Sequence, residues 1–190
     1  MVKLGNVVTS APKRRLYLSK QMLIGIVLVV LAIAGLTAWE IHHRSEENNK
    51  AAEEASAVRL DNEQYTSLQV QTNSYSAAGQ FGQAASAWVS YAQKTPSSTH
   101  RKIAWEQAGS MYMSAGSFAQ ALQAYKTAAT ISKLNYTEAY GAATAAMRLK
   151  DKTQAIYYLQ QSIRLMPANT LDASTQRELF NQEIDSMEKL

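Results

Sequence analysis

The residues that could carry metal or acid–base chemistry are few in this chain, and their spacing suits neither role. Its three histidines are His42, His43 and His100, and it has no cysteine. Neighbouring residues on a helix point about 100° apart, so His42 and His43 cannot both face one metal ion, and an interfacial or solvent role fits them better. His100 stands alone in a segment that reads as a loop. Histidines without thiolates do not supply the common zinc sites, and we predict no metal and no cofactor.

Catalytic patterns are also missing from the sequence. It contains no phosphate-binding loop, no dinucleotide-binding glycine pattern, no zinc-protease motif and no nucleophile elbow. Asp and Glu residues are scattered at the intervals of solvated helix faces. Asn135-Tyr136-Thr137 has the form of a glycosylation sequon, but Asn135 fits a helix N-cap equally well. The sequence therefore predicts a protein that is not an enzyme.

The net charge of +4 belongs to the N-terminal tail and not to the body of the protein. Residues 1–20 contain five basic residues and no acidic residue, whereas residues 51–190 contain 12 of each. A nucleic-acid-binding domain concentrates positive charge on its folded surface. The neutral body therefore argues against a nucleic-acid partner.

An uncharged apolar segment from Met22 to Trp39 follows this tail. Its 18 residues are enough for a helix to cross a bilayer core, and Tyr17 and Trp39 lie near its ends, where aromatic rings prefer the membrane interface. We predict a transmembrane helix over 21–40, with the lipid bilayer as a partner. The alternatives are a buried core helix and a signal peptide cleaved after Ala32-Ile33-Ala34, which has the form of a cleavage site.

The basic residues before the apolar segment predict its orientation. By the positive-inside rule, residues 1–20 form a cytoplasmic tail and the part after residue 40 lies outside the cytoplasm. Residues 41–64 are polar and rich in alanine, which predicts a helical linker that extends the membrane helix or leads into the next domain.

Small and aromatic residues recur at fixed intervals over residues 65–169. Apolar residues return at helical spacing throughout this stretch. Gly79 and Gly116 stand where a helix end needs left-handed backbone. Pro96 and Pro167 stand where a helix should stop. The clearest series is Trp105, Ala108, Gly109, Tyr112, Gly116, Phe118, Ala121, Tyr125 and Ala128.

This spacing resembles the tetratricopeptide repeat (TPR), a helix–turn–helix unit of 34 residues. The copies align at 65–98, 102–135 and 136–169, with residues 99–101 as an insertion, and with Gln71 and Thr72 departing from the pattern in the first copy. The resemblance implies an all-α fold, an α-solenoid of about three hairpins. Residues 170–190 carry apolar residues at i, i+4 and i+7 and predict a capping helix, whose stripe is formed by Phe180, Ile184 and Met187 and widened by Leu179 and Leu190.

In TPR proteins the first helix of each repeat lines a concave surface that binds a protein or peptide. Carried over by position, the resemblance implies a partner-binding groove of neutral polar residues, two methionines and a tyrosine. The alternative is that these residues pack only against the C-terminal helix. The implied groove residues are Gln69, Asn73, Glu106, Ser110, Met113, Tyr140, Thr144, Met147 and Arg148.

One apolar span followed by TPR-like repeats resembles bacterial membrane-anchored TPR proteins. The resemblance implies an adaptor for protein–protein interaction in envelope assembly, secretion or translocation. Two other functions remain open at this point: a permanent structural subunit of a membrane complex, and a cytosol-facing TPR receptor on a membrane.

Overall fold

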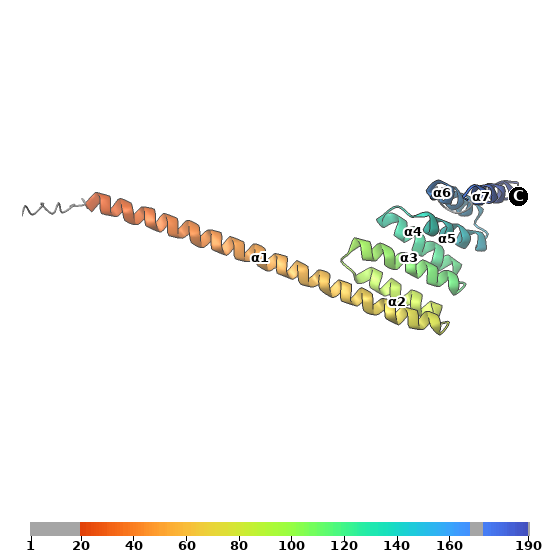
Figure 1. Cartoon of the computed structure of the whole chain (residues 1–190), viewed down its shortest axis with the longest axis horizontal. Helices are drawn as coiled ribbons and strands as arrows, with labels where there is room; N and C mark the ends of the chain where they lie inside the picture. The colour runs from red at the N-terminus through yellow and green to blue at the C-terminus, as the bar shows by residue number, and fades with distance from the viewer. Residues whose placement is uncertain (1–19, 168–172, 190) are drawn as a thin grey trace, which may run out of the picture. The chain divides into compact units, whose positions relative to one another are not determined.

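The computed structural model describes residues 20–167 and 173–189, and every regular element in these ranges is a helix. The chain divides into two compact units, Met1–Glu54 and Ala55–Leu190. The predicted cytoplasmic tail, apart from Lys20, lies outside the described residues, as do residues 168–172 and Leu190. The helices (Figure 1) are α1 (Lys20–Ala77), α2 (Phe81–Lys94), α3 (Ser98–Ser114), α4 (Phe118–Ile131), α5 (Tyr136–Arg148), α6 (Lys152–Leu165) and α7 (Ala173–Glu188).

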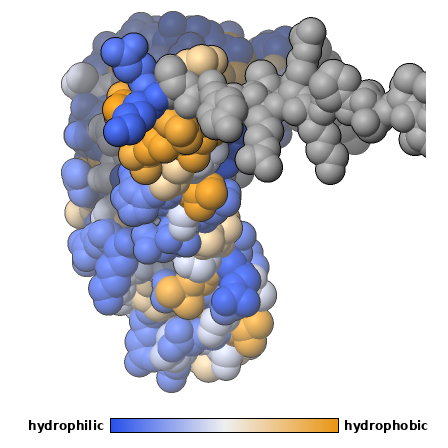
Figure 2. Space-filling model, turned by 90° about the vertical axis from the view of Figure 1, so that its left-hand side faces the viewer, coloured by the Kyte–Doolittle hydropathy of each residue, from blue (hydrophilic) through white to orange (hydrophobic). Residues whose placement is uncertain are grey.

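The first unit contains the apolar beginning of α1. This stretch is long and apolar enough to cross a membrane, and none of it is buried within the structure. Figure 2, which faces the N-terminal end of α1, shows hydrophobic residues gathered on the surface there. Exposing so many large aliphatic side chains to water is unfavourable. An apolar environment outside the chain, or removal of the segment, would avoid that cost.

The polar part of α1 that follows carries histidine–glutamate contacts one helical turn apart. His42 lies 3.4 Å from Glu46, and His43 lies 3.4 Å from Glu47. The ring of His43 also stacks on Trp39, with 5.4 Å between the ring centroids. The two histidines therefore face different glutamates, as expected for adjacent positions on a helix.

The second unit is built from helical hairpins. The end of α1 packs on α2 through Leu68 and Trp88, which share one buried cluster. Then α3 packs on α4 and α5 packs on α6. The hairpins also contact one another, because α2 packs on α3, α4 packs on α5 and α6 packs on α7. Each hairpin therefore buries its apolar face against its neighbours, as a helical-repeat solenoid requires.

The two turns with predicted left-handed glycines have that geometry. Gly79 has φ +72° and Gly116 has φ +71°, and each follows the first helix of its hairpin. In the third hairpin the same place is held by Lys150 with φ 60°. That conformation costs a residue with a side chain about 1–2 kcal/mol, so the third turn is the most strained of the three.

Local signals also fix several helix ends. Asn135 caps α5, because its Oδ1 accepts from the Glu138 backbone N–H at 3.0 Å while Glu138 Oε2 accepts from the Asn135 backbone N–H at 2.8 Å. This capping box confirms the N-cap interpretation of Asn135. Helices α2 and α6 end at Lys94 and Leu165, two residues before Pro96 and Pro167.

Three expectations need correction or refinement. His100 does not lie in a loop; it belongs to the first turn of α3, because Ser97 accepts a hydrogen bond from the His100 backbone N–H and begins the helix there. Leu179 does not widen the buried stripe of α7, since it is 54% exposed, whereas Phe180 and Ile184 are buried. Thr72 fills a small buried position after all, because its hydroxyl donates to the Leu68 carbonyl at 2.9 Å and is thereby satisfied.

Candidate functional site

The predicted groove residues all lie on the first helices of the hairpins, namely α1 after Ala55, α3 and α5. Helix α3 contacts α5, and Ser76 of α1 donates a hydrogen bond to the Met111 sulfur of α3 at 3.2 Å. These first helices therefore lie side by side. We call the side of the repeats that they form the first-helix surface. In a solenoid of this kind that side is the concave one.

The predicted residues differ in how far they reach solvent. Exposed ones could contact a partner directly, whereas half-buried ones shape the floor beneath them. The exposed residues are Gln69, Asn73, Ser110, Tyr140 and Arg148. The half-buried residues are Glu106, Met113, Thr144 and Met147.

The two methionines lie against the same core. Met113 of α3 and Met147 of α5 both pack on the cluster that contains Tyr125 and Leu159. Methionine is flexible and polarizable, so it adapts to irregular apolar shapes. These two side chains give the first-helix surface an apolar floor.

Helix α7 covers part of the predicted site. The ring of Phe180 stacks on Tyr140, with 5.2 Å between the centroids, and the Tyr136 hydroxyl donates to Gln176 Oε1 at 3.2 Å. Met187 packs against the same cluster as Met147. Tyr140 nevertheless stays 40% exposed, so the C-terminal helix does not close it off.

Arg148 contacts Phe118 of α4. Its guanidinium carbon lies 5.8 Å from the ring centroid of Phe118, at the start of α4. This cation–π contact directs the arginine toward the second hairpin.

A charged cluster that the sequence did not reveal lies between α3 and α5. Lys102 pairs with Glu106 one turn along α3 and with Glu138 of α5, where Nζ lies 3.2 Å from Glu138 Oε2. Glu106 is a predicted groove residue, whereas Lys102 and Glu138 were missed. Two local signals could have found them: Lys102 and Glu106 have the i, i+4 spacing of helical ion pairs, and Asn135 with Glu138 has the spacing of a capping box.

Two carboxylates share one ammonium in this cluster. Burial of Glu106 and its contact with Glu138 raise the pKa of Glu106 to about 7, although Lys102 opposes the shift. Burial lowers the pKa of Lys102, but its bonds to Glu106 and Glu138 outweigh burial, so the net shift is upward. The cluster therefore joins the two first helices electrostatically through Lys102.

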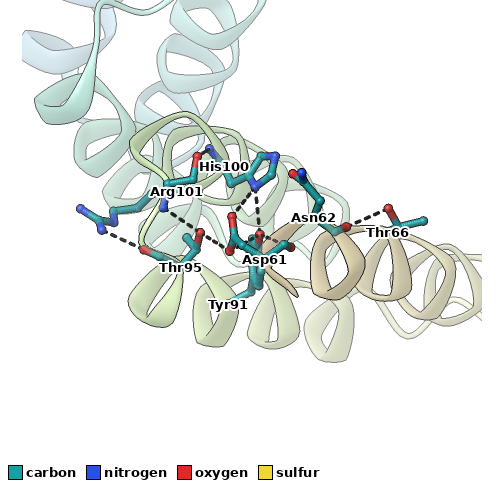
Figure 3. A network of polar contacts seen from close by, with 8 residues as sticks. Asp61, Asn62, Thr66, Tyr91, Thr95, His100 and Arg101 are labelled. Carbon is teal, nitrogen blue, oxygen red and sulfur yellow. Dashed lines mark hydrogen bonds and ion pairs between the residues drawn. The ribbon is translucent and has the colours of Figure 1, made fainter. Parts of the chain in front are cut away.

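A second polar network joins the end of α1 to α2 and α3. The Asp61 carboxylate is 5% exposed and accepts hydrogen bonds from the Thr95 hydroxyl at 2.6 Å and from the Tyr91 hydroxyl at 3.0 Å. Its other oxygen lies 2.7 Å from His100 Nδ1, and the Tyr65 ring stacks on His100 with 4.5 Å between centroids. Figure 3 shows Tyr91 of α2, Thr95 of the α2–α3 connection and His100 of α3 converging on Asp61 of α1.

The network keeps Asp61 ionised. Burial alone would raise the pKa of Asp61, but the hydrogen bonds from Thr95, His100 and Tyr91 outweigh burial and lower it. Its hydroxyl and imidazole partners are used in holding the carboxylate. We therefore interpret the network as a structural clamp on the first hairpin.

Solved structures of other proteins agree with this architecture. No family model matches the chain, and no curated protein matches it. Among solved structures it is similar to the TPR domain of Sgt2 from Aspergillus fumigatus, with a TM-score of 0.53. The likeness covers 66% of this chain and 82% of that chain at 14% sequence identity. The chain contains a TPR-like helical repeat domain.

Repeats of this kind stack into an extended surface. At 14% identity the likeness concerns the fold alone. Which residues of the TPR-like domain contact a partner has to be argued from this chain's own surface.

Proposed function

We propose that this chain is a membrane-anchored adaptor that holds a protein or peptide partner on its first-helix surface. The observation that carries the proposal is the apolar floor of Met113 and Met147 beside the exposed Tyr140, on neighbouring first helices of a TPR-like domain. Aromatic and methionine side chains are enriched at protein interfaces. An apolar or helical peptide suits such a surface.

The exposed apolar segment of α1 supports membrane anchoring. The positive-inside rule favours a cytoplasmic N-terminus and repeats outside the cytoplasm, where the adaptor would act in envelope assembly, secretion or translocation. The absence of cysteine from the sequence makes this topology easy to test.

For the topology, a cysteine added after Leu190 is expected to react with a membrane-impermeant maleimide from the extracytoplasmic side of intact cells. A second variant with its cysteine at Val2 should react only after the membrane is opened. Labelling of the C-terminal cysteine solely from the cytoplasmic side would contradict the proposed orientation. The apparent mass of the mature chain separates an uncleaved anchor from a cleaved signal segment.

For the partner site, a photo-crosslinking amino acid at Tyr140 or Met113 is expected to capture a partner protein in cells. The matched control carries the same amino acid at Gln123, an exposed position on the second helix α4, and should not capture the same protein. Recovery of α7 alone from both Tyr140 and Met113 would contradict a peptide groove and leave a purely structural role for these residues.

A further inference from the structure

The outer side of the third hairpin carries an apolar hollow with a cationic rim. The hollow lies between the end of α4 and helix α6, and its volume is about 420 Å³. That volume falls within the range of about 300–1,000 Å³ found for ligand pockets. We call this surface the outer patch, formed by Ala129, Lys133, Leu134, Tyr157, Arg164 and Leu165.

The repeats themselves provide the comparison that makes the outer patch unusual. Aligned in repeat register, the place of Tyr157 is held by Gln123 in the second copy and by Ser86 in the first. Both of those side chains are polar and exposed. The stack of hairpins therefore does not require an aromatic ring at this outward position.

The neighbouring positions depart in part. Arg164 corresponds to the uncharged Thr130 and Gln93, whereas Leu165 differs from Lys94 of the first copy but matches the aliphatic Ile131 of the second. Tyr157 is 51% exposed and Leu165 is 38% exposed. Single exposed apolar residues are common, but here two of them line one hollow together with Leu134.

The aromatic ring of the outer patch is held in place. Tyr157 meets the buried Tyr158 edge to face, with 4.9 Å between centroids and 77° between planes. A ring that is already ordered loses little conformational entropy on binding. Tyrosine and arginine are also enriched among the residues that dominate binding energy at interfaces.

The positive charge of the outer patch favours a partner with carboxylates. Neither Lys133 nor Arg164 forms an ion pair with another residue in the described ranges. Arg164 donates from Nε to the Gln160 carbonyl at 3.3 Å, which leaves the other guanidinium N–H groups for a carboxylate.

We propose that the outer patch is a second docking surface, which binds an acidic protein segment with an aliphatic or aromatic residue next to Asp or Glu. The apolar side chain enters the hollow beside Tyr157 and Leu165, and the carboxylate pairs with Arg164 and Lys133. Because the patch lies on second helices, this surface is separate from the first-helix surface, and one chain can hold two partners at once.

The test uses the full chain in phosphatidylcholine nanodiscs and two labelled peptides. One has the sequence Glu-Leu-Glu-Phe-Leu-Glu, and its twin has lysine in place of each glutamate. Fluorescence anisotropy is expected to show saturable binding of the acidic peptide, weakened by added salt, and no binding of the twin. Tyr157→Ser and Arg164→Gln, which restore the first-copy residues, should each weaken binding at least about fivefold.

Matched variants keep the result interpretable. Gln123→Ser makes the corresponding change in the second hairpin and should leave binding unchanged. The substituted positions are exposed, and circular dichroism checks that each variant is folded. Equal binding of both peptides, no saturable binding, or binding that Tyr157→Ser leaves intact would overturn the proposal. So would a dimer that sedimentation detects and Tyr157→Ser abolishes, because the occupant would then be a second copy.

Discussion

Replacing Tyr125 with alanine is expected to lower the free energy of unfolding by about 3–5 kcal/mol, the range for truncating a buried aromatic side chain. Tyr125 of α4 is 6% exposed and packs in the core shared by the second and third hairpins. Its ring also lies against two glycines. A Cβ on Gly109 of α3 would stand 2.9 Å from the ring, and one on Gly141 of α5 would stand 2.7 Å from the hydroxyl.

A substitution at Gly109 tests the contact between Tyr125 and α3 more sharply. Gly109→Ala forces a clash with the ring, which costs about 1–3 kcal/mol, and the better helix propensity of alanine returns up to about 1 kcal/mol. In a Tyr125→Ala background the ring is missing, so the added methyl group meets no clash. Gly109→Ala is therefore expected to destabilise the wild type and to be neutral or stabilising in the double variant.

Urea unfolding of the single and double variants measures this coupling. Gln123→Ala, an exposed change on the same helix, should stay within about 0.5 kcal/mol of the wild type. If the effects of Gly109→Ala and Tyr125→Ala simply add, the ring does not depend on the glycine, and the close packing of α3 against α4 has another cause.

The three hairpin turns show which backbone geometry can be predicted from local sequence. Gly79 and Gly116 predicted left-handed backbone, because a residue without a side chain adopts it at no steric cost, and both have positive φ. The third turn was placed correctly around Lys150, but nothing in a lysine predicts φ 60°. That geometry is imposed by the packing of α5 on α6 and not by the residue.

Contacts between distant segments could not be predicted in this way. Asp61 and His100 are 39 residues apart, and the sequence placed one in a linker and the other in a loop. A lone carboxylate in a polar helix carries no sign of its burial, because that burial follows from the docking of α1 on α2. The same reason explains Leu179, whose exposure depends on how α7 is rotated about its axis.

The candidate site was predicted only in outline. Repeat register placed Met113, Tyr140 and Met147 on first helices, and the structure confirms their positions on α3 and α5. It also shows Phe180 stacked on Tyr140 and Glu106 shared between Lys102 and Glu138, which repeat register cannot specify. Whether these residues bind a partner stays a prediction for the crosslinking experiment.

The clamp around Asp61 leads to the second large effect. Asp61→Ala is expected to destabilise the repeat unit by several kcal/mol, because each buried donor left without its acceptor costs about 1–3 kcal/mol. The hydroxyls of Tyr91 and Thr95 and the imidazole of His100 would lose their acceptor. Asp61→Asn keeps an acceptor oxygen of nearly the same shape, so its cost should be smaller.

The pH dependence separates the charge of Asp61 from its shape. Because the folded state lowers the pKa of Asp61, the clamp contributes fully above the unfolded pKa of about 3.9. That contribution is lost as the pH falls through the lower pKa of the folded state. Urea midpoints measured from pH 6 down to pH 2.5 should therefore fall for the wild type, and Asp61→Asn should lack this part of the decline.

Glu63→Gln is the matched control, because Glu63 lies on the same helix and its carboxylate is exposed, 3.9 Å from Arg59. Exposed ion pairs of this kind contribute about 0–1 kcal/mol, so the control should reproduce the wild-type decline. If Asp61→Asn follows the wild type over the whole range, the carboxylate is not held ionised by its neighbours. The first hairpin would then depend on packing around Leu68 and Trp88 alone, and the clamp would be reduced to a set of neutral hydrogen bonds.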